Sequence, residues 1–336
     1  MRITGCGVDG EAIAIGLIAL SLAVPFLTAD PFIYSVANQI AIAITATFSV
    51  YLMLKMGLLT FAVPAFMAVG GYSVAIASLK GGVTDSFVLT ALSFLAPAVL
   101  ALPLGALVLR LKGVYFVLVT FLLSEITQLV LFETPGLTGG SNGLVGMPAT
   151  TAFGIVMADN QSVLILAIVV ALLAAIITAG VSGYYRQPFA AIEENDILAE
   201  SLGLVVWRHK VIGFFVAAGL AGMAGFSLVN MLLTAHPTSF SPESSVNYIA
   251  YAIIGGCNSM FGPVAGSILL VWMTNVLSTQ GQYSQGLFGL LLIFVVLVAR
   301  GGITGAASGL ARRIGRGRNL YKTKSVPSAS VKNGSA

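Results

Sequence analysis

The sequence has few charged residues, and this scarcity excludes an ordinary soluble domain. Lysine, arginine, aspartate and glutamate together make up 8% of the 336 residues, against about 25% in soluble domains. Hydrophobic residues make up 57%, and the mean hydropathy is +0.99. The sequence therefore predicts an all-α protein, a polytopic bundle of transmembrane helices.

Cysteine and histidine are also scarce, at two residues each. Cys6 and Cys257 are too few and too far apart for a disulfide framework or a metal site, so we expect two free thiols. His209 and His236 have no carboxylate, serine or cysteine at a spacing typical of catalysis or metal binding. The sequence also lacks a Walker motif and a catalytic nucleophile. We therefore predict a protein that is not an enzyme and has no metal and no cofactor.

Ten apolar stretches are candidate membrane segments and define a predicted transmembrane domain over residues 1–305. A span needs about 20 mainly apolar residues. The eighth stretch is too short, so we expect a tilted, broken or re-entrant segment buried among other helices. Residues 306–336 are rich in Gly, Ser, Lys and Arg, and we expect a disordered cytoplasmic tail. The ten segments are Ala12–Leu27, Phe32–Leu54, Leu58–Leu79, Phe87–Leu109, Val114–Phe132, Val163–Tyr184, Val211–Leu233, Tyr248–Gly256, Val264–Leu277 and Gly286–Ala299.

The basic residues are distributed as the positive-inside tendency requires. If the polar run at 184–210 is cytoplasmic, Lys80 is the only one of the sixteen lysines and arginines that falls outside. This topology places both termini in the cytoplasm. A pI near 9.1 is also typical of nucleic-acid-binding proteins. Here the cations lie in loops and in the tail, where they orient the chain in the lipid bilayer, so we expect no nucleic acid as a partner.

The longest polar run between two predicted segments is Tyr184–Lys210, which holds four of the twelve acidic residues. Pro188 favours the start of a helix and Gly203 its end, which predicts one helix over about 188–202. At about 100° per residue, this helix has an acidic edge and an apolar edge. It either docks in a groove of a soluble partner or is an ordinary solvated helix. The acidic residues are Glu193, Glu194, Asp196 and Glu200, and the apolar edge comprises Ala191, Ile192, Leu198, Ala199 and Leu202.

A second polar stretch, Glu133–Ser162, faces the outside in this topology. Its five glycines between Gly136 and Gly146 indicate a chain that turns tightly or packs its backbone closely. The stretch lacks the Gly-Lys-Ser/Thr ending of a phosphate-binding loop, which argues against a nucleotide site. It is either a flexible loop or a structured cap that meets a binding protein over the outer mouth of a pathway. Its candidate residues are Thr138, Gly139, Gly140, Ser141, Asn142 and Gly143.

Glu125 is the one acidic residue well inside a predicted segment, about 16 Å along the helix from Val114. An ionisable group at this depth is costly, and it either lines a transport pathway or holds a contact between helices. No basic residue lies at a comparable depth, so its carboxyl group must be protonated, hydrated or hydrogen-bonded. We group Glu125 with Thr120 and Asn247 as candidate pathway residues.

Small residues recur inside the segments at small-xxx-small spacing. Such residues allow two helix backbones to approach closely in lipid, and we expect them to pack helices together. The glycines near 255 and 262 are alternatively explained by local unwinding near the pathway. The spaced pairs are Ala218/Gly222, Ala221/Gly225 and Gly262/Gly266.

Three motif regions, in the same order, resemble one known family. The run AAIEENDILAESLGLVVWRHKVIGFFVAAGLAGMAG at 190–225 is similar to the cytoplasmic coupling loop and following span of the branched-chain amino acid ABC importer permeases of the LivM type. GVYFVLVTFLLSE at 113–125 with LTGGSNGLVGMP at 137–148, and IIGGCNSMFGPVAG at 253–266, also resemble that family. One departure is GLLTFAVP at 57–64, where the family has Gly-Leu-x-Ser-x-Gly-x-Ala.

The resemblance implies a multi-pass subunit of an ATP-driven importer in the bacterial plasma membrane. Its partners would be a second related permease, two ABC ATPase subunits and a soluble substrate-binding protein. In such importers the loop helix seats in a cleft of the ATPase, so Glu193, Glu194, Asp196, Glu200 and Gly203 would couple the two chains. The family's usual cargo is leucine, isoleucine and valine, and related systems carry urea or short amides.

Two other functional classes agree less well with the sequence. A stand-alone secondary transporter or channel needs coupling-ion groups in several spans, whereas Glu125 stands nearly alone. A membrane-embedded enzyme needs paired polar catalytic groups at one depth, and we find none in the sequence. We therefore expect a separate chain to hydrolyse ATP.

Overall fold

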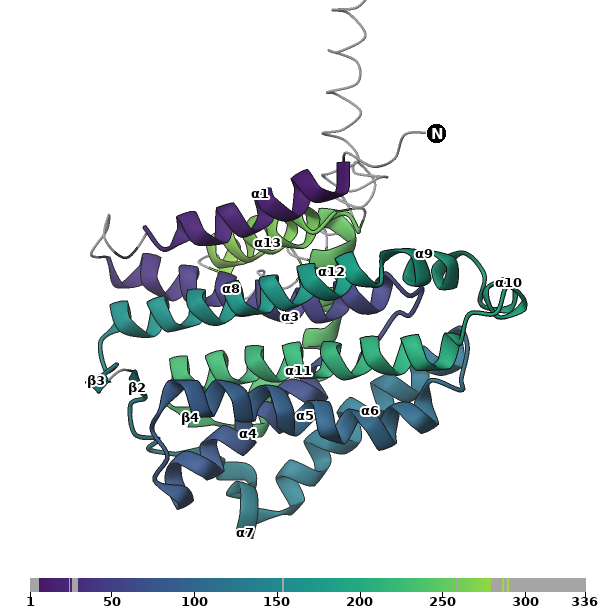
Figure 1. Ribbon diagram of the computed structural model, residues 1–336. Coiled ribbons are helices and arrows are strands. Elements are labelled where there is room, and N and C mark those ends of the chain that lie inside the picture. The colour runs from purple at the N-terminus through teal and green to yellow at the C-terminus, as the bar shows by residue number, and fades with distance from the viewer. Residues whose placement is uncertain are drawn as a thin grey trace, which may run out of the picture.

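The computed structural model describes residues 6–23, 25, 30–152, 154–257, 259–278, 286 and 289, which form a bundle of helices (Figure 1). Within these residues, six helices are long and apolar enough to cross a membrane, judged by length and composition. They confirm the predicted polytopic helical membrane protein. The six are α3 (Pro31–Leu54), α4 (Val63–Gly81), α5 (Ser86–Val108), α6 (Val114–Glu133), α8 (Asn160–Tyr184) and α11 (Val206–Leu232).

Three more apolar helices are α1 (Cys6–Ser21), α12 (Ser244–Gly255) and α13 (Phe261–Ser278). The 12 residues of α12 span about 18 Å, too short to cross a bilayer alone, as the eighth predicted segment implied. The predicted count of ten is not confirmed. The tenth segment, Gly286–Ala299, lies outside the described residues except for Gly286 and Gly289, and the predicted tail at 306–336 lies outside them entirely.

α11 is the central helix of the bundle. It packs against α3, α4, α5 and α8, and in Figure 1 it lies between α8 and α3 on one side and α5 and α4 on the other. A Cβ added to Gly222 would collide with the carbonyl oxygen of Ser93 in α5, and one added to Gly225 with that of Met67 in α4. The predicted close packing at these two glycines is therefore confirmed. A movement of α11 must displace the helices that surround it.

α12 and α13 meet in a similarly close contact. A Cβ added to Gly262 would collide with the carbonyl oxygen of Gly256, and one added to Gly266 with that of Tyr251. Gly256, at φ +98°, ends α12 in a conformation that favours glycine. The predicted packing at Gly262 and Gly266 is confirmed, together with a helix break at Gly256.

Short elements gather at the two ends of the bundle (Figure 1). At one end, strand β1 pairs antiparallel with β4, and β2 pairs antiparallel with β3. The helices of the polar run lie at the opposite end. The first group is α7 (Pro135–Thr138), η1 (Gly140–Asn142), β1 (Leu144–Val145), β2 (Thr151–Ala152), β3 (Ile155–Val156), β4 (Thr234–Ala235) and η2 (Pro237–Phe240), and the second is α9 (Arg186–Glu194) and α10 (Asp196–Ser201).

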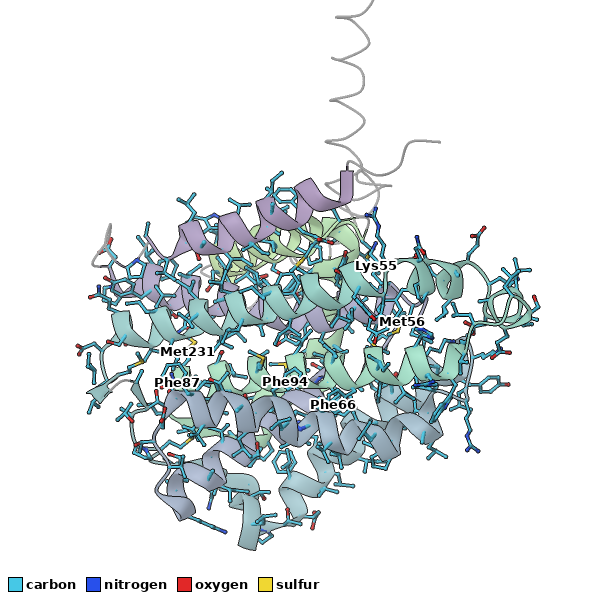
Figure 2. All side chains as sticks on the ribbon, viewed as in Figure 1. Lys55, Met56, Phe66, Phe87, Phe94 and Met231 are labelled. Atoms are coloured by element: carbon cyan, nitrogen blue, oxygen red, sulfur yellow. The ribbon has the colours of Figure 1, made fainter. Side chains whose placement is uncertain are left out.

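Lysine residues lie at both ends of the bundle. Lys112 and Lys210 lie beside α10, and Lys55 interacts electrostatically with Glu193 of α9. Lys80 lies at the other end, where it donates a hydrogen bond to the Gly-rich stretch. Figure 2 places Lys55 near α9. The placement of α9 and α10 in the cytoplasm stays a prediction.

Candidate functional site

The polar run at 184–210 forms two helices instead of the single helix predicted over 188–202. The break falls at Asn195, whose backbone is extended, with φ −164° and ψ 111°. Its Oδ1 accepts hydrogen bonds from the backbone N–H groups of Ile197 and Leu198, at 3.0 and 3.2 Å. Asparagine is among the strongest helix N-caps, and here it starts a new helix where periodicity predicted a continuous one.

The predicted end of this region at Gly203 is confirmed. Gly203 has φ +88°, and its N–H donates to the carbonyl of Glu200 at 2.9 Å. A residue with a Cβ is strained in this left-handed conformation, so glycine suits the position.

A small apolar core holds α9 and α10 against the bundle. Ile192 of α9, Ala199 of α10 and Val206 of α11 are buried together. Phe189 of α9 is also buried, and its ring stacks on Tyr185 with 5.5 Å between centroids. The two short helices are therefore attached to the N-terminal end of α11.

A partly buried ion pair adds a second attachment. The Nζ of Lys210 in α11 donates to the Oδ2 of Asp196 in α10 at 2.6 Å, and the two side chains are 7% and 20% exposed. Lys112, between α5 and α6, lies 3.9 Å from the same oxygen and is 67% exposed. All three residues line a cleft of about 350 Å³. Asp196 thus contacts α11, a role that the sequence pattern did not predict.

Three large apolar side chains are exposed on α10 and the turn after it. Ile197, Leu198 and Leu202 are 71%, 56% and 80% exposed, and we name these three residues the α10 tip. The helical pattern placed Leu198, Ala199 and Leu202 on one apolar edge, and the structure divides this edge: Ala199 is buried, whereas Leu198 and Leu202 are exposed. The acidic residues beside the tip that are exposed are Glu193, Glu194 and Glu200.

The connection between α3 and α4 has no regular structure at residues 58–62, although it runs inside the bundle. The N–H of Phe61 donates to Thr120 Oγ1 of α6 at 3.2 Å. The carbonyl of Phe61 accepts from Ser124 Oγ of α6 at 2.8 Å and from Ser245 Oγ of α12 at 2.7 Å. We name this set of contacts the Phe61 joint. Irregular backbone at membrane depth is tolerated where other groups satisfy it in this way.

The three candidate pathway residues are not brought together within this chain. Glu125 lies on the exposed face of α6, where Leu122 and Ile126 are 52% and 57% exposed. It makes no ion pair with any residue that the structure describes. Thr120 is buried in the Phe61 joint. Asn247 lines a separate cleft of about 180 Å³ between α3, α11, α12 and α13.

The Gly-rich outer stretch is a structured cap at its end of the bundle and not an open loop. Gly139, Gly140 and Gly143 have φ values of +77°, +57° and +66°. A Cβ on Gly139 would collide with the carbonyl oxygen of Gly143. The ring Nε2 of His236 lies 2.8 Å from the carbonyl oxygen of Ser141, next to the β1–β4 pair. Glycine is needed here because the chain turns back tightly on itself.

Thr138 attaches this cap to α6. Its Oγ1 donates to the carbonyl of Leu131 at 2.7 Å and accepts from the N–H of Gly140 at 3.3 Å. Asn142 ends the short helix η1 in the same turn. All six candidate residues of the outer stretch therefore lie in one ordered segment.

The profile of a protein family described as "Branched-chain amino acid transport system / permease component" matches residues 32–299. The chain belongs to this permease family. It is 27% identical over 320 residues to the high-affinity branched-chain amino acid transport system permease protein LivM of Escherichia coli K12, and equally to LivM of Salmonella typhimurium LT2. These alignments cover 88% of this chain and 75% of each relative. No solved structure matches the chain.

Family membership confirms the resemblance to LivM-type permeases and makes the chain a multi-pass transport component. The sequence did not single out two features of this permease. Lys210 was counted only as a loop cation, although it lies one turn after the buried Val206 and so shares its helix face. The hydroxyls of Ser124 and Ser245 are far apart in sequence, and no spacing links them to Phe61.

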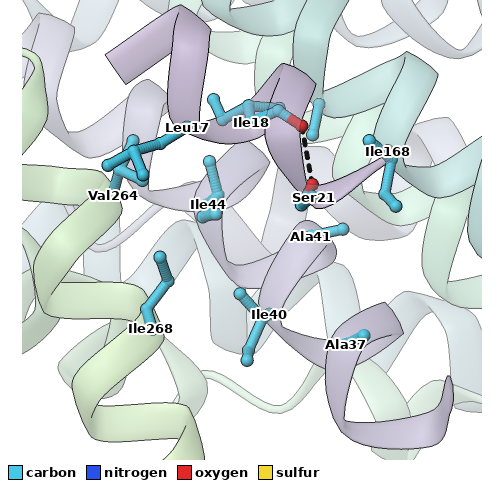
Figure 3. A pocket seen from close by; sticks show the side chains of 11 residues that line it. Leu17, Ile18, Ser21, Ala37, Ile40, Ala41, Ile44, Ile168, Val264 and Ile268 are labelled. Atoms are coloured by element: carbon cyan, nitrogen blue, oxygen red, sulfur yellow. Dashed lines mark hydrogen bonds between the residues drawn. The ribbon is translucent and has the colours of Figure 1, made fainter. Parts of the chain in front are cut away.

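The permease also contains an aliphatic crevice of about 170 Å³ between α1, α3, α8 and α13 (Figure 3). Ile18, Ile44, Ile168 and Val264 are among its lining residues. The hydrogen bond drawn there, from Ser21 Oγ to the carbonyl of Ile18 at 2.6 Å, lies within α1. None of the lining residues that the structure describes has a charged or amide side chain. The crevice therefore does not suit a zwitterionic or amide solute, and we assign it no part in the pathway.

Proposed function

We propose that this chain is the permease subunit of an ATP-driven importer in the bacterial plasma membrane. Its partners are a second related permease, two ABC ATPase subunits and a soluble substrate-binding protein. The family match and the two LivM relatives support this function. Their printed names favour a branched-chain amino acid as cargo, and the alternative is urea or a short amide. The observation that carries the coupling part of the proposal is the α10 tip.

The α10 tip is suited to a partner in the cytosol. Three large apolar side chains are exposed to water there, at the end of the bundle where the cations gather. Burying apolar side chains in a groove is the main source of affinity when a helix docks on a partner. Glu193, Glu194 and Glu200 lie around the tip. The ATPase groove would therefore have an apolar floor with basic residues at its rim.

The test is co-purification of the ATPase encoded with this permease. Leu198→Asp places a charge in the proposed contact, and Leu137→Asp is the matched control because Leu137 is 54% exposed at the outer end. We expect Leu198→Asp to lower the bound ATPase by roughly tenfold or more, given the burial of one leucine side chain. We expect Leu137→Asp to leave it unchanged. Equal binding by Leu198→Asp and the parent would exclude the α10 tip as the docking surface.

Uptake into liposomes distinguishes an importer from a transporter that works alone. We expect uptake of branched-chain amino acids only with both permeases, the ATPase, the binding protein and ATP. Uptake by the permease without any ATPase would instead establish a secondary transporter or channel.

We also propose that the pathway runs along the Glu125 face of α6, where this chain meets the second permease. A carboxyl group that faces lipid at this depth is costly, and cover by a second protein chain or by water in a pathway removes that cost. The exposure of Glu125 on α6 supports this placement. Thr120 and Asn247 stay candidates. Thr120 binds the main chain of residue 61 on the buried side of α6, and Asn247 lines the cleft between α3, α11, α12 and α13. The outer cap is the proposed contact with the binding protein.

A further inference from the structure

We propose that Lys210 is a positioning residue: by binding Asp196 it locks α10 to α11, so that the docking element and the central helix move as one body. The proposal rests on the proposed function, because it assumes that an ATPase pulls on α10. The further inference is how a movement of α10 is transmitted to the transmembrane helices.

The first support is the place of the pair. Lys210 lies four residues after Val206, so both side chains are on the face of α11 that meets α10. Val206 contributes an apolar contact with Ala199, and Lys210 a charged contact with Asp196 at 2.6 Å. Asp196 is the first residue of α10, directly after the cap at Asn195. The ion pair therefore holds the end of α10 that the helix break would otherwise leave free to pivot.

The second support is the close packing of α11 against several other helices. The same cytoplasmic part of α11 contains Gly213, where an added Cβ would collide with the side chain of Met56 in the turn after α3. Further along, Gly222 and Gly225 lie against the backbones of α5 and α4. The backbone contacts at Gly222 and Gly225 have little slack. A displacement of α10 that is passed to α11 thus reaches α4 and α5, and both of these helices pack against α6.

Lys210 is more deeply buried than Asp196, and this difference predicts which substitution weakens the contact between α10 and α11 more. Asp196→Asn leaves the ammonium group of Lys210 without its partner, although its side chain is only 7% exposed. Lys210→Met leaves Asp196 unpaired, but that side chain is 20% exposed and has Lys112 at 3.9 Å. An unpaired charge costs more where it is more deeply buried. Asp196→Asn should therefore disturb the lock more than Lys210→Met.

The experiment measures solute transported per ATP hydrolysed by the full complex in liposomes. We expect this ratio to fall roughly tenfold in Asp196→Asn and less in Lys210→Met, because breaking a buried pair by removing one partner is strongly destabilising. Lys112→Met is the matched control, since it removes a cation beside the same carboxylate at an exposed position. We expect its ratio to equal that of the parent. The charge-swapped variant Asp196→Lys with Lys210→Asp should regain part of the loss.

Co-purified ATPase is measured in the same samples. We expect it to be unchanged in Lys210→Met, because that residue is buried under α10 and does not face the partner. A parental transport ratio in both Lys210→Met and Asp196→Asn overturns the lock. If Asp196→Asn does not fold, Lys210→Met and the swapped variant decide. Failure of the proposed function looks different, because the parent complex itself would then show no ATP-driven uptake.

Discussion

At the scale of single residues, backbone conformation explains why particular glycines lie in the outer cap. Gly139 has a φ of +77°, and the carbonyl oxygen of Gly143 lies where the Cβ of any other residue would be. Gly136, three residues earlier, has open space around that place and no left-handed backbone. The sequence shows both as members of one Gly-rich run. Only the structure separates the glycine that the fold requires from the one that it tolerates.

This difference predicts the outcome of a paired substitution. Gly139→Val should distort the cap, because a β-branched residue is strained at positive φ and would clash with Gly143. We expect transport to fall severalfold, whereas Gly136→Val should transport like the parent. Uptake into cells that produce equal amounts of each variant is the measurement. Parental uptake by Gly139→Val would show that the cap takes no part in transport.

A second residue-scale prediction concerns the thiol of Cys257. Burial raises the pKa of Cys257, and the charge of Lys55 opposes this only in part. Because the thiolate is the reactive form, less of it is present at any pH below the raised pKa. In a Cys6→Ser background, we expect alkylation to be slower than in the unfolded chain at neutral pH. Its rate should still be rising above pH of about 8.5, where an ordinary thiol is half ionised.

Mass spectrometry of alkylated protein against pH provides this measurement. The unfolded chain in denaturant is the control, since it contains the same cysteine without burial. Equal rates for folded and unfolded protein across the whole pH range would contradict the prediction.

At the scale of elements, the polar run shows where sequence patterns succeed and where they fail. Gly203 correctly marked the end of the helical region, whereas the region begins at Arg186, two residues before Pro188. The break at Asn195 was missed, since apolar periodicity continues across it while a side-chain cap starts a new helix. Leu198 and Leu202 were therefore grouped with Ala199 on one edge, although they are exposed and Ala199 is buried. Local signals predict helix ends, whereas the orientation of α10 depends on its contacts with α11.

The cap at Asn195 gives an element-scale prediction. Asn195→Ala removes the acceptor of two backbone N–H groups and should destabilise α10 by about 1 kcal/mol. Hydrogen exchange of the amides in α10 should then be roughly fivefold faster, if local opening is the route. Ser201→Ala is the control, because the hydroxyl of Ser201 bonds only the carbonyl of Leu198 within its own turn. Unchanged exchange in Asn195→Ala would show that tertiary contacts alone hold α10.

At the scale of the whole molecule, composition was enough to predict the class and the family motifs were enough to predict the relatives. The close packing around α11 was partly predictable from the sequence, because its small residues follow the small-xxx-small spacing. The placement of Glu125 was not predictable in this way. Its depth follows from its position in α6, but the side of α6 that it occupies depends on how six long helices pack.

The exposed position of Glu125 gives the prediction at this scale. Glu125→Gln keeps the shape of the side chain and removes its charge, and we expect transport to fall roughly tenfold while the complex still assembles. Glu133→Gln is the control, since Glu133 is exposed at the C-terminal end of the same helix. Uptake and subunit co-purification are measured together. Parental values of both in Glu125→Gln would mean that the charge does not matter.

A photo-reactive amino acid locates the second permease directly. Placed at Leu122, beside Glu125, it should cross-link to the second permease, whereas at Ile176 of α8, which is 51% exposed, it should label lipid. Cross-linking at Ile176 and none at Leu122 would place the subunit contact on another face.

The Phe61 joint has a consequence for how the sequences of relatives diverge. All three of its hydrogen bonds use the main chain of residue 61, so they do not depend on which side chain stands there. The hydroxyl groups at positions 120, 124 and 245 have no such freedom, because each bond needs an oxygen on that side chain. Homologous proteins should therefore vary in the side chain at position 61 but keep serine or threonine at the three positions that bind its main chain.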